Sequence, residues 1–262
     1  MLITVFTPTY NRAPLLSRLF ISLQQQTFKD FEWLIVDDGS TDDTEVKVKE
    51  FIEQSKKDTK FPIRYFKKEN GGKHTAINVA VKLAIGELFF IVDSDDYLPN
   101  DSLRNVVAVY NGIKDNNEFA GVCGLDADPT GRIVGNGLSD DILDCTLIQA
   151  EYEYHLVGDK KEVYRTSILR AFPFPEIKRE RFCPENLVWY RIAKQYKLRY
   201  FNTVIYIADY QPGGITDNMV AVRRRSPKLA CLYYKELLAL RIPLKYKIRG
   251  LFNLIRYEVN LI

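Results

Sequence analysis

The chain has 262 residues, of which 46% are hydrophobic and 13% aromatic, so it is long and apolar enough to fold around a sizeable core. This composition excludes a disordered chain, and the net charge of +3 argues against nucleic acid as the principal partner. The cysteines form no CxxC pair, which indicates neither a disulfide framework nor a zinc ribbon and suits a reducing cytosol. They are Cys123, Cys145, Cys183 and Cys231.

The sequence carries no signal for export or membrane insertion. No apolar run approaches the ~20 residues of a membrane-spanning helix. The opening stretch MLITVFTPTYN lacks the basic region and the small-residue cleavage site of a secretory signal. We therefore expect a cytoplasmic protein without a membrane span.

The first part of the chain alternates between strand-like and helix-like hydrophobic periods. Strands are predicted at 2–6, 31–38, 63–66 and 89–92, and helices at 11–23, 40–52, 76–84 and 102–109. This alternation predicts right-handed crossovers and a mostly parallel sheet, whose ligands lie beyond the carboxyl ends of the strands. The α/β class follows from the same pattern.

Polar residues before these helices suggest how the helices begin. Asn11 is predicted to cap the first helix, which carries Pro14 in its first turn. Ser40 and Asp43 have the spacing of a capping box. Asp96 or Asn100 is the predicted cap of the helix that starts near Ser102.

After about Ala127 the alternation weakens into a mixed α+β elaboration. The pattern predicts a hairpin-like turn at 128–137, a strand feeding a helix at 159–172, a helix at 184–196 and a strand at 199–210. With no repeat or flexible linker, we expect one catalytic domain over 1–222 and a helical extension over 223–262.

Three carboxylates, Asp93, Asp95 and Asp96, follow the strand that ends near Val92. Like charges this close need a cation, a base or open water, so the alternatives are a ligand site and a solvated strand-to-helix turn. The glycine-rich Rossmann fingerprint and the P-loop are both absent. A bound diphosphate would therefore need a divalent cation, which prefers oxygen ligands such as clustered aspartates.

The two histidines, His74 and His155, disfavour a histidine-rich zinc centre and a Ser-His-Asp triad. Each is interpreted as an ordinary surface or polar-core residue. Trp33 and Trp189 are interpreted as core residues rather than sugar-binding platforms.

Three blocks resemble, in order and spacing, the family 2 glycosyltransferases with the GT-A fold. They read TPTYNRAPLLSRLFISLQQQTFKDFEWLIVDDGSTDDT, NGGKHTAINVAVKLAIGELFFIVDSDD and PENLVWYRIAKQYKLRYFNTVIY. The resemblance implies a Rossmann-like, mostly parallel sheet and an inverting transferase. It also implies a nucleotide-activated sugar as donor and Mg²⁺ or Mn²⁺ as cofactor.

The resemblance assigns the donor site first. Pro8 and Tyr10 match the turn that contacts the nucleobase, and Asp38 matches the aspartate that bonds it. Lys73 lies in the loop that approaches the donor. Ser94, at the centre of the acidic cluster, is implied to contact the nucleotide sugar as well.

The resemblance also assigns the metal site and the catalytic base. Asp93-Ser94-Asp95 match the DxD metal motif, with Asp93 also facing the nucleotide sugar, and Asp96 is the adjoining acid. The later Glu-Asp pair of the family appears here as Pro184-Glu185, placed by Trp189. Glu185 is thus the expected base, a departure from the aspartate that is usual at this position.

The expected activity is transfer of a hexosyl or N-acetylhexosaminyl group to an acceptor hydroxyl of a glycan, in the biosynthesis of a surface polysaccharide. One alternative is a sugar nucleotidyltransferase, although no GxGTR-like turn follows the first strand. The other is a non-catalytic protein that binds nucleotide sugars, against which the acidic cluster and Glu185 both weigh.

The C-terminal segment is basic, with ten lysines and arginines against two acids between Arg223 and Glu258. Over residues 241–256 apolar and basic side chains alternate in a pattern suited to an anionic membrane surface. Peripheral contact at the inner face of the membrane would suit a lipid-linked acceptor. The alternative is a helix packed on the catalytic domain with a solvated basic face.

Overall fold

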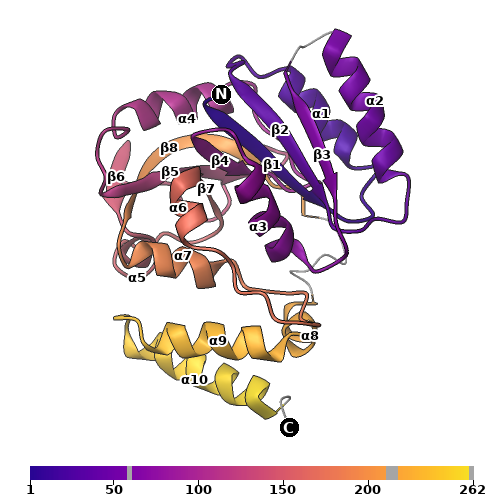
Figure 1. Ribbon diagram of the computed structural model, residues 1–262. Helices are drawn as coiled ribbons and strands as arrows, with labels where there is room; N and C mark the ends of the chain where they lie inside the picture. The colour runs from indigo at the N-terminus through magenta and orange to yellow at the C-terminus, as the bar shows by residue number, and fades with distance from the viewer. Residues whose placement is uncertain (58–60, 211–217, 260–262) are drawn as a thin grey trace.

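The computed structural model describes residues 1–57, 61–210 and 218–259 (Figure 1). Its described residues contain an eight-stranded sheet with the strand order β3-β2-β1-β4-β7-β5-β8-β6. The strands are β1 (Ile3–Thr9), β2 (Phe31–Asp37), β3 (Ile63–Lys67), β4 (Leu88–Ile91), β5 (Phe119–Ala127), β6 (Ile142–Cys145), β7 (Lys160–Arg165) and β8 (Lys197–Ile207).

Helices cover both faces of this sheet (Figure 1). Those over the first two thirds of the chain are α1 (Leu16–Gln24), α2 (Thr44–Lys57), α3 (Lys73–Leu83), α4 (Ser102–Asn111), α5 (Leu147–Tyr152) and α6 (Thr166–Ala171). Those that follow are α7 (Asn186–Ala193), α8 (Met219–Arg224), α9 (Pro227–Leu238) and α10 (Leu244–Glu258).

The chain order creates a switch point at β1. From β1 the chain steps outward through β2 to β3, then returns to place β4 on the other side of β1, with all these pairs parallel. Helices that connect such strands on opposite sides of a central strand diverge at its carboxyl end and leave a crevice there. The predicted donor residues follow these same strands.

Each strand divides its side chains between two cores, because successive residues point to opposite faces. Val5 and Trp33 belong to the core under α1, α2 and α4, whereas Phe6 and Leu34 belong to the core under α3 and α7. All four side chains are fully buried. The short hydrophobic runs of the sequence therefore form strands that are covered on both sides.

The second half of the sheet is mixed. β7 pairs antiparallel with both β4 and β5, while β5 and β8 are parallel and β6 pairs antiparallel with β8. The elements predicted after Ala127 are confirmed, including the strand and helix now seen as β7 and α6 and the helix α7. Trp33 and Trp189 are buried, as expected for core residues.

The predicted helix caps are wrong. The α1 helix begins at Leu16, and the side chain of Asn11 instead accepts a hydrogen bond from the Thr41 backbone N–H at 2.8 Å. Ser40 accepts one from the Asn11 N–H at 2.8 Å, so each residue serves the contact between two loops. At α4 the N-cap residue is Asp101, and its side chain makes no capping bond.

The C-terminal helices pack on the same core as α7. Leu229, Ala230 and Tyr234 of α9 are buried in the hydrophobic cluster that includes Leu187. The Arg191 guanidinium of α7 donates to both carboxylate oxygens of Glu236, at 2.6 and 3.0 Å. Among the helices described here, none is long and apolar enough to cross a membrane. The four cysteines are buried and free.

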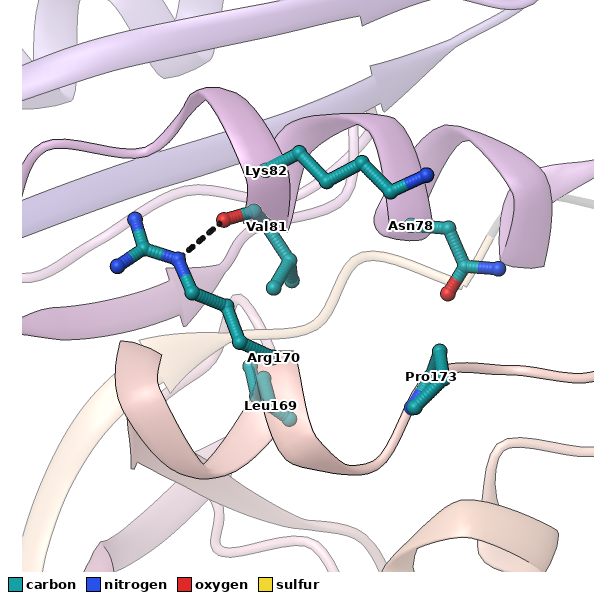
Figure 2. Close-up of a pocket in the computed structure, with 6 residues that line it drawn as sticks. All are labelled: Asn78, Val81, Lys82, Leu169, Arg170 and Pro173. Atoms are coloured by element: carbon teal, nitrogen blue, oxygen red, sulfur yellow. Dashed lines mark hydrogen bonds between the residues drawn. The ribbon is translucent and has the colours of Figure 1, made fainter.

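A cavity of about 310 Å³ lies between α3 and α6 (Figure 2). Arg170 of α6 spans its edge and donates to the carbonyls of Val81 and Ala84 at 3.2 and 2.7 Å, which satisfies the C-terminal end of α3. Asn78 and Lys82 also line it. Lys73, a predicted site residue, is the first residue of α3, whereas the cavity is lined by Asn78, Val81 and Lys82 from the later part of that helix. The cavity therefore lies away from Lys73.

The buried carboxylate of Glu32 holds three separate elements together. It accepts hydrogen bonds from the Thr4 hydroxyl at 2.6 Å, the Ile85 N–H at 3.0 Å and the Arg64 guanidinium at 2.9 Å. Its side chain has no exposed surface. The loss of this carboxylate would leave the Thr4 hydroxyl and the Ile85 N–H without their acceptor, and Arg64 with the Leu83 carbonyl at 2.9 Å but without this counter-charge.

We expect Glu32→Ala to lower the free energy of unfolding by about 3 kcal/mol, because it removes the charged partner of the partly buried Arg64 guanidinium. Urea denaturation measures the change. Glu45→Ala, which removes an acid from the exposed pair with Lys49, is the matched control and should leave the unfolding midpoint almost unchanged. Equal midpoints for the two variants would contradict the structural role of Glu32.

Candidate active site

Asp38 closes the turn after β2 by binding the loop before α3. Its two carboxylate oxygens accept the backbone N–H groups of Gly71 and Gly72 at 2.9 and 2.7 Å, and Lys68 donates its ammonium at 2.7 Å. Asp38 and its neighbour Asp37 are both buried, but Asp37 accepts hydrogen bonds from the Tyr65 hydroxyl and the Ser40 N–H. The structure thus gives the two adjacent aspartates different environments.

Gly72 brings this loop against a distant part of the chain. Its φ of +95° lies in the left-handed region that favours glycine. A Cβ at this position would lie 1.9 Å from the carbonyl oxygen of Arg181, closer than any contact allows. The loop before α3 and the segment before Glu185 therefore touch through backbone alone.

Lys73 bridges two of the carboxylates that the sequence singled out. Its ammonium lies 2.7 Å from an oxygen of Asp93 and 2.8 Å from an oxygen of Glu185. The three side chains come from the start of α3, the turn after β4 and the residue before α7. The fold thus brings together at one ammonium residues from two separate sequence blocks.

The charges of this trio stabilise one another. Burial would lower the pKa of Lys73, but Asp93 and Glu185 outweigh it and raise that pKa above its ordinary value. Burial would likewise raise the pKa of Asp93, and the Lys73 ammonium, helped by Lys161 and Arg12, reverses the effect and lowers it. Asp93 is accordingly ionised and Lys73 protonated at neutral pH.

Two arginines contact the acidic cluster at Asp95. Arg12 approaches the carboxylate of Asp95, with 3.6 Å between the charged atoms. Arg18 donates to the backbone carbonyl of Asp95 and forms an ion pair with Asp209 at 2.5 Å. Asp95 is half-buried and Ser94 is buried, so Asp95 rather than Ser94 has its side chain open to solvent.

Asp96 faces the end of β8 rather than its neighbours. It accepts hydrogen bonds from the Tyr206 hydroxyl and from the Asp209 N–H, the latter at 2.8 Å. The same hydroxyl accepts the N–H of Asp93 at 3.1 Å. Burial, with the nearby charge of Asp93, raises the pKa of Asp96 to about 6.

The segment that carries Glu185 is anchored by the C-terminal helices. Glu180 is buried and its carboxylate accepts the N–H groups of Lys228 and Leu229 at 2.8 and 2.7 Å, at the start of α9. The Phe182 N–H donates to the hydroxyl of Ser226 at 3.0 Å. These bonds fix the approach of Glu185 to Lys73.

The turn that is predicted to contact the nucleobase is more open. Tyr10 is 46% exposed, and Pro8 is half-buried near the end of β1. This turn lies beside Asp38, whose backbone N–H donates to the Thr9 carbonyl at 2.8 Å. Tyr10 therefore offers an uncovered ring next to the predicted donor site.

The carboxylate oxygens of the acidic cluster are suitable ligands for a divalent cation, but the three side chains do not converge on one point. Within the described part of the chain, no group of three or more Asp, Glu, His or Cys side chains converges to hold a metal ion. Asp93, Asp95 and Asp96 instead have three different partners. Mg²⁺ is commonly held by one or two carboxylates together with substrate phosphates, and this all-oxygen set suits such a shared site.

Several partners of the predicted residues were not found from the sequence. Lys68, Arg12 and Tyr206 contact Asp38, Asp95 and Asp96 respectively. Arg12 and Lys68 each follow a predicted strand, and that placement is the signal that could have identified them. Tyr206 gave no such signal, because it reads as one aromatic residue of a strand.

A second group of carboxylates lies at the middle of the sheet, at the ends of β5 and β7. Asp126 is 3% exposed, and one of its oxygens has no hydrogen-bond partner. Burial raises the pKa of Asp126 to about 7, against the lowering effect of Lys161. Burial also raises the pKa of Glu162 to about 8.

Comparisons with known proteins give the family of the first half of the chain. Residues 4–124, which contain the Asp38 turn, Lys73 and the acidic cluster, match the family model described as Glycosyl transferase family 2. Residues 4–124 of the chain belong to glycosyltransferase family 2. Two curated relatives align with more than 124 residues of the chain, so their similarity extends into the half that contains Glu185.

One relative is the poly(ribitol-phosphate) beta-N-acetylglucosaminyltransferase TarS of Staphylococcus aureus, 30% identical over 181 residues, 67% of this chain and 30% of TarS. The other is the GalNAc(5)-diNAcBac-PP-undecaprenol beta-1,3-glucosyltransferase of Campylobacter jejuni, 29% identical over 202 residues, 74% of this chain and 60% of that protein. The chain spans less than a third of the length of the first curated relatives that it matches.

Solved structures of such glycosyltransferases have the same fold. TarS 1–349 of S. aureus in complex with UDP-GlcNAc matches 98% of this chain and 72% of that chain, with a TM-score of 0.71 and 24% identity. The mannosyltransferase PcManGT of Pyrobaculum calidifontis, in complex with GDP-Man and Mn²⁺, matches 99% of this chain and 73% of that chain, with a TM-score of 0.63 and 20% identity. The GT-A fold expected for this chain is confirmed.

The raised pKa of Asp126 predicts a pH-dependent stability. Below pH ~4 the carboxyl is protonated in both the folded and the unfolded chain. Between pH ~4 and about 7 only the folded chain keeps the proton, so its stability falls as the pH rises. Asp126→Asn removes this titration, and we expect it to gain stability over the wild type by up to about 1 kcal/mol per pH unit across that window.

Urea denaturation of both proteins at several pH values measures this difference. The stability gap should stay constant above pH ~7, where Asp126 is ionised in both states. Parallel stability profiles from pH 4 to 8 would show that Asp126 titrates normally.

Proposed function

We propose that this chain transfers a hexosyl or N-acetylhexosaminyl group, with inversion, from a nucleoside-diphosphate sugar to an acceptor hydroxyl. The family match and the activities in the names of its relatives support sugar transfer. The observation that carries the proposal is the contact of Lys73 with both Asp93 and Glu185. A donor-side acid and a candidate base for the acceptor then lie at one ammonium group.

The proposed chemistry assigns Glu185 the acceptor proton. An alcohol attacks poorly unless a positioned base takes its proton, and a half-buried carboxylate at the start of α7 can do so. As the acceptor oxygen bonds the anomeric carbon, the bond from that carbon to the diphosphate breaks and its electrons leave with the diphosphate. Attack opposite to the leaving group inverts the anomeric centre.

The leaving diphosphate develops negative charge that the site must balance. Asp93 and Asp95, with Asp96 adjoining, are the residues we propose to hold Mg²⁺ or Mn²⁺, and the bound cation would supply electrostatic stabilisation of the diphosphate. The Mn²⁺ in the PcManGT complex is consistent with this assignment. Arg12, beside Asp95, adds a fixed positive charge of the chain itself.

Asp38, Pro8 and Tyr10 form the proposed nucleoside site. The open ring of Tyr10 offers a stacking surface, and Asp38 offers an acceptor for an N–H of the base. Lys73 and Ser94 are proposed to line the path from nucleoside to sugar. Thermal-shift measurements with UDP-, GDP- and dTDP-sugars, with and without Mn²⁺, would identify the nucleobase.

The proposal extends to the acceptor and to the place of action. The Campylobacter relative is named for an undecaprenol-linked acceptor, and a glycan or lipid-linked acceptor is proposed here. Action in the cytoplasm at the inner face of the membrane, in surface polysaccharide assembly, would follow. The basic C-terminal segment over residues 241–256 supports peripheral contact with that membrane.

Glu185→Gln should lower turnover by about 10² to 10⁴, the usual contribution of a general base, because it keeps size and shape but removes basicity. Acceptor-dependent transfer measures turnover, and calorimetric titration measures donor affinity, which should change little. Glu185→Asp should retain partial activity. Near-normal transfer by Glu185→Gln would move the base to another carboxylate, first Asp96 and then Asp159, which accepts the Tyr210 hydroxyl at 2.8 Å.

Asp95→Asn should abolish the metal dependence of nucleotide binding, because it removes a half-buried carboxylate that is proposed to hold the cation. Asp38→Ala should weaken nucleotide binding without removing the metal-dependent binding of free pyrophosphate. Titrations of nucleotide and pyrophosphate, with and without Mn²⁺, separate the two effects.

Asp38→Asn is the matched control, since its amide oxygen can still accept the Gly71 or Gly72 N–H. An intermediate affinity for this variant would show how much of the loss comes from the loop. Unchanged nucleotide titrations in both Asp95→Asn and Asp38→Ala would refute the donor-site assignment.

A further inference from the structure

Helix α10 has two apolar faces, and only one of them is packed. Gly250, Leu254 and Tyr257 are buried against α9, where the Tyr257 and Tyr234 rings stack with centroids 5.8 Å apart. A Cβ at Gly250 would lie 3.3 Å from a methyl of Leu237, so the two helices approach closely. This inner face accounts for the attachment of α10 to the protein.

The outer face of α10 is apolar and exposed. Its members are Leu244, Ile248, Leu251, Phe252, Ile255 and Val259. Because successive residues rotate by about 100°, these six side chains fall within an arc of about 100° on one side of the helix. Leu244 is 70% exposed and Phe252 69%, the largest values among the exposed apolar side chains of the described chain.

A basic row borders this outer face. Lys245, Arg249 and Arg256 are exposed and occupy the neighbouring arc of the helix. With Ile248 and Phe252 of the outer face they line a surface cavity of about 410 Å³, which therefore has apolar and cationic walls together. Figure 1 shows α10 as the outermost layer, on the side of α9 away from the sheet.

We propose that the outer face of α10 docks flat on a membrane surface rich in anionic phospholipid. An exposed apolar strip would enter the boundary between headgroups and acyl chains, while the basic row meets the phosphate groups. A nucleic acid or an acidic protein would bind the basic row, but it would leave the apolar side chains of Leu244 and Phe252 exposed to solvent. A second copy of the chain would juxtapose two basic rows and repel.

This inference deepens the proposed contact with a membrane and rests on that proposed function for its biological use. It is tested without any measurement of sugar transfer, so that its failure and the failure of the proposed activity are distinguishable. Leu238 and Ile242 belong to the packed side of the C-terminal helices, since Ile242 is buried and Leu238 is partly buried against the core. They are therefore excluded from the docking face.

The full chain is sedimented with vesicles of phosphatidylcholine alone and of equimolar phosphatidylcholine and phosphatidylglycerol. We expect retention by the anionic vesicles at low salt, and loss of retention on neutral vesicles and in about 1 M salt, where charges are screened beyond ~3 Å. A wild-type chain that anionic vesicles fail to retain at low salt would overturn the proposal.

Two double variants divide the contributions. Ile248→Ser with Phe252→Ser removes apolar surface, and Lys245→Glu with Arg249→Glu reverses the basic row. Each should lower the partition coefficient at least about tenfold, given the usual contribution of a single basic residue near an anionic surface and of buried apolar area. Unchanged retention of the serine variant would refute apolar insertion, and unchanged retention of the glutamate variant would refute the role of the basic row. Either result would overturn the proposed docking mode, which needs both.

Matched controls alter equally exposed residues elsewhere. Val46→Ser with Ile85→Ser removes apolar groups that are 57% and 56% exposed, and Lys57→Glu with Lys114→Glu reverses two exposed lysines. Both controls should bind vesicles as the wild type does. A loss in the controls equal to that in the α10 variants would show that general hydrophobicity or net charge governs retention.

A reporter variant keeps the outer face apolar and guards against misfolding of the serine variants. Phe252→Trp places an indole on that face, whereas the native Trp33 and Trp189 are buried. Acyl chains carrying bromine should quench this indole, and should not quench the control Phe66→Trp on β3. Absence of quenching, or a dimer in analytical ultracentrifugation that Phe252→Ser dissociates, would assign the outer face to another partner.

Discussion

A single ammonium group joins the two halves of this protein at its candidate site. Lys73 pairs with Asp93, from the parallel half of the sheet, and with Glu185, from the mixed half. Removal of the lysine would leave two partly buried carboxylates facing one another, which repel unless a cation takes its place. The position of Glu185 relative to the acidic cluster therefore depends on a charge balance, and the segment before it is built to support that balance through Glu180 and Ser226.

This dependence links the C-terminal helices to the crevice by hydrogen bonds as well as by packing. Glu180 accepts two N–H groups at the start of α9, five residues before the carboxylate proposed as the base. The Arg191 to Glu236 ion pair makes a second connection, from α7 to the far half of α9. The helices over 223–259 thus take part in holding the site, whatever surface their outer side contacts.

Six of the eight described strands, most helices and the acidic cluster could be predicted from the sequence, because alternating periods and strand-end acids reflect local chemistry. The strands β5 and β6 were not predicted. The caps could not be predicted either. Asn11 and Ser40 are good capping residues in isolation, but here they bond each other's loops, a contact between segments far apart in the chain. The pairing of Lys73 with Glu185 was missed for the same reason, although both residues were singled out. In α10 the apolar residues of two faces are interleaved in the sequence. Both alternatives from the sequence therefore hold: one face of the helix is packed on the protein, and the other is exposed and amphipathic.

Gly72 sets a limit on how freely the chain can vary. Most glycines in turns serve a dihedral angle alone and tolerate asparagine at modest cost. Here the missing Cβ is also the space occupied by the Arg181 backbone, 1.9 Å away from where that atom would be. Any side chain at position 72 must push the later segment outward and carry Glu185 with it. In a saturation library, position 72 should therefore accept no replacement. The effect of any substitution would be a displacement of the segment that carries Glu185.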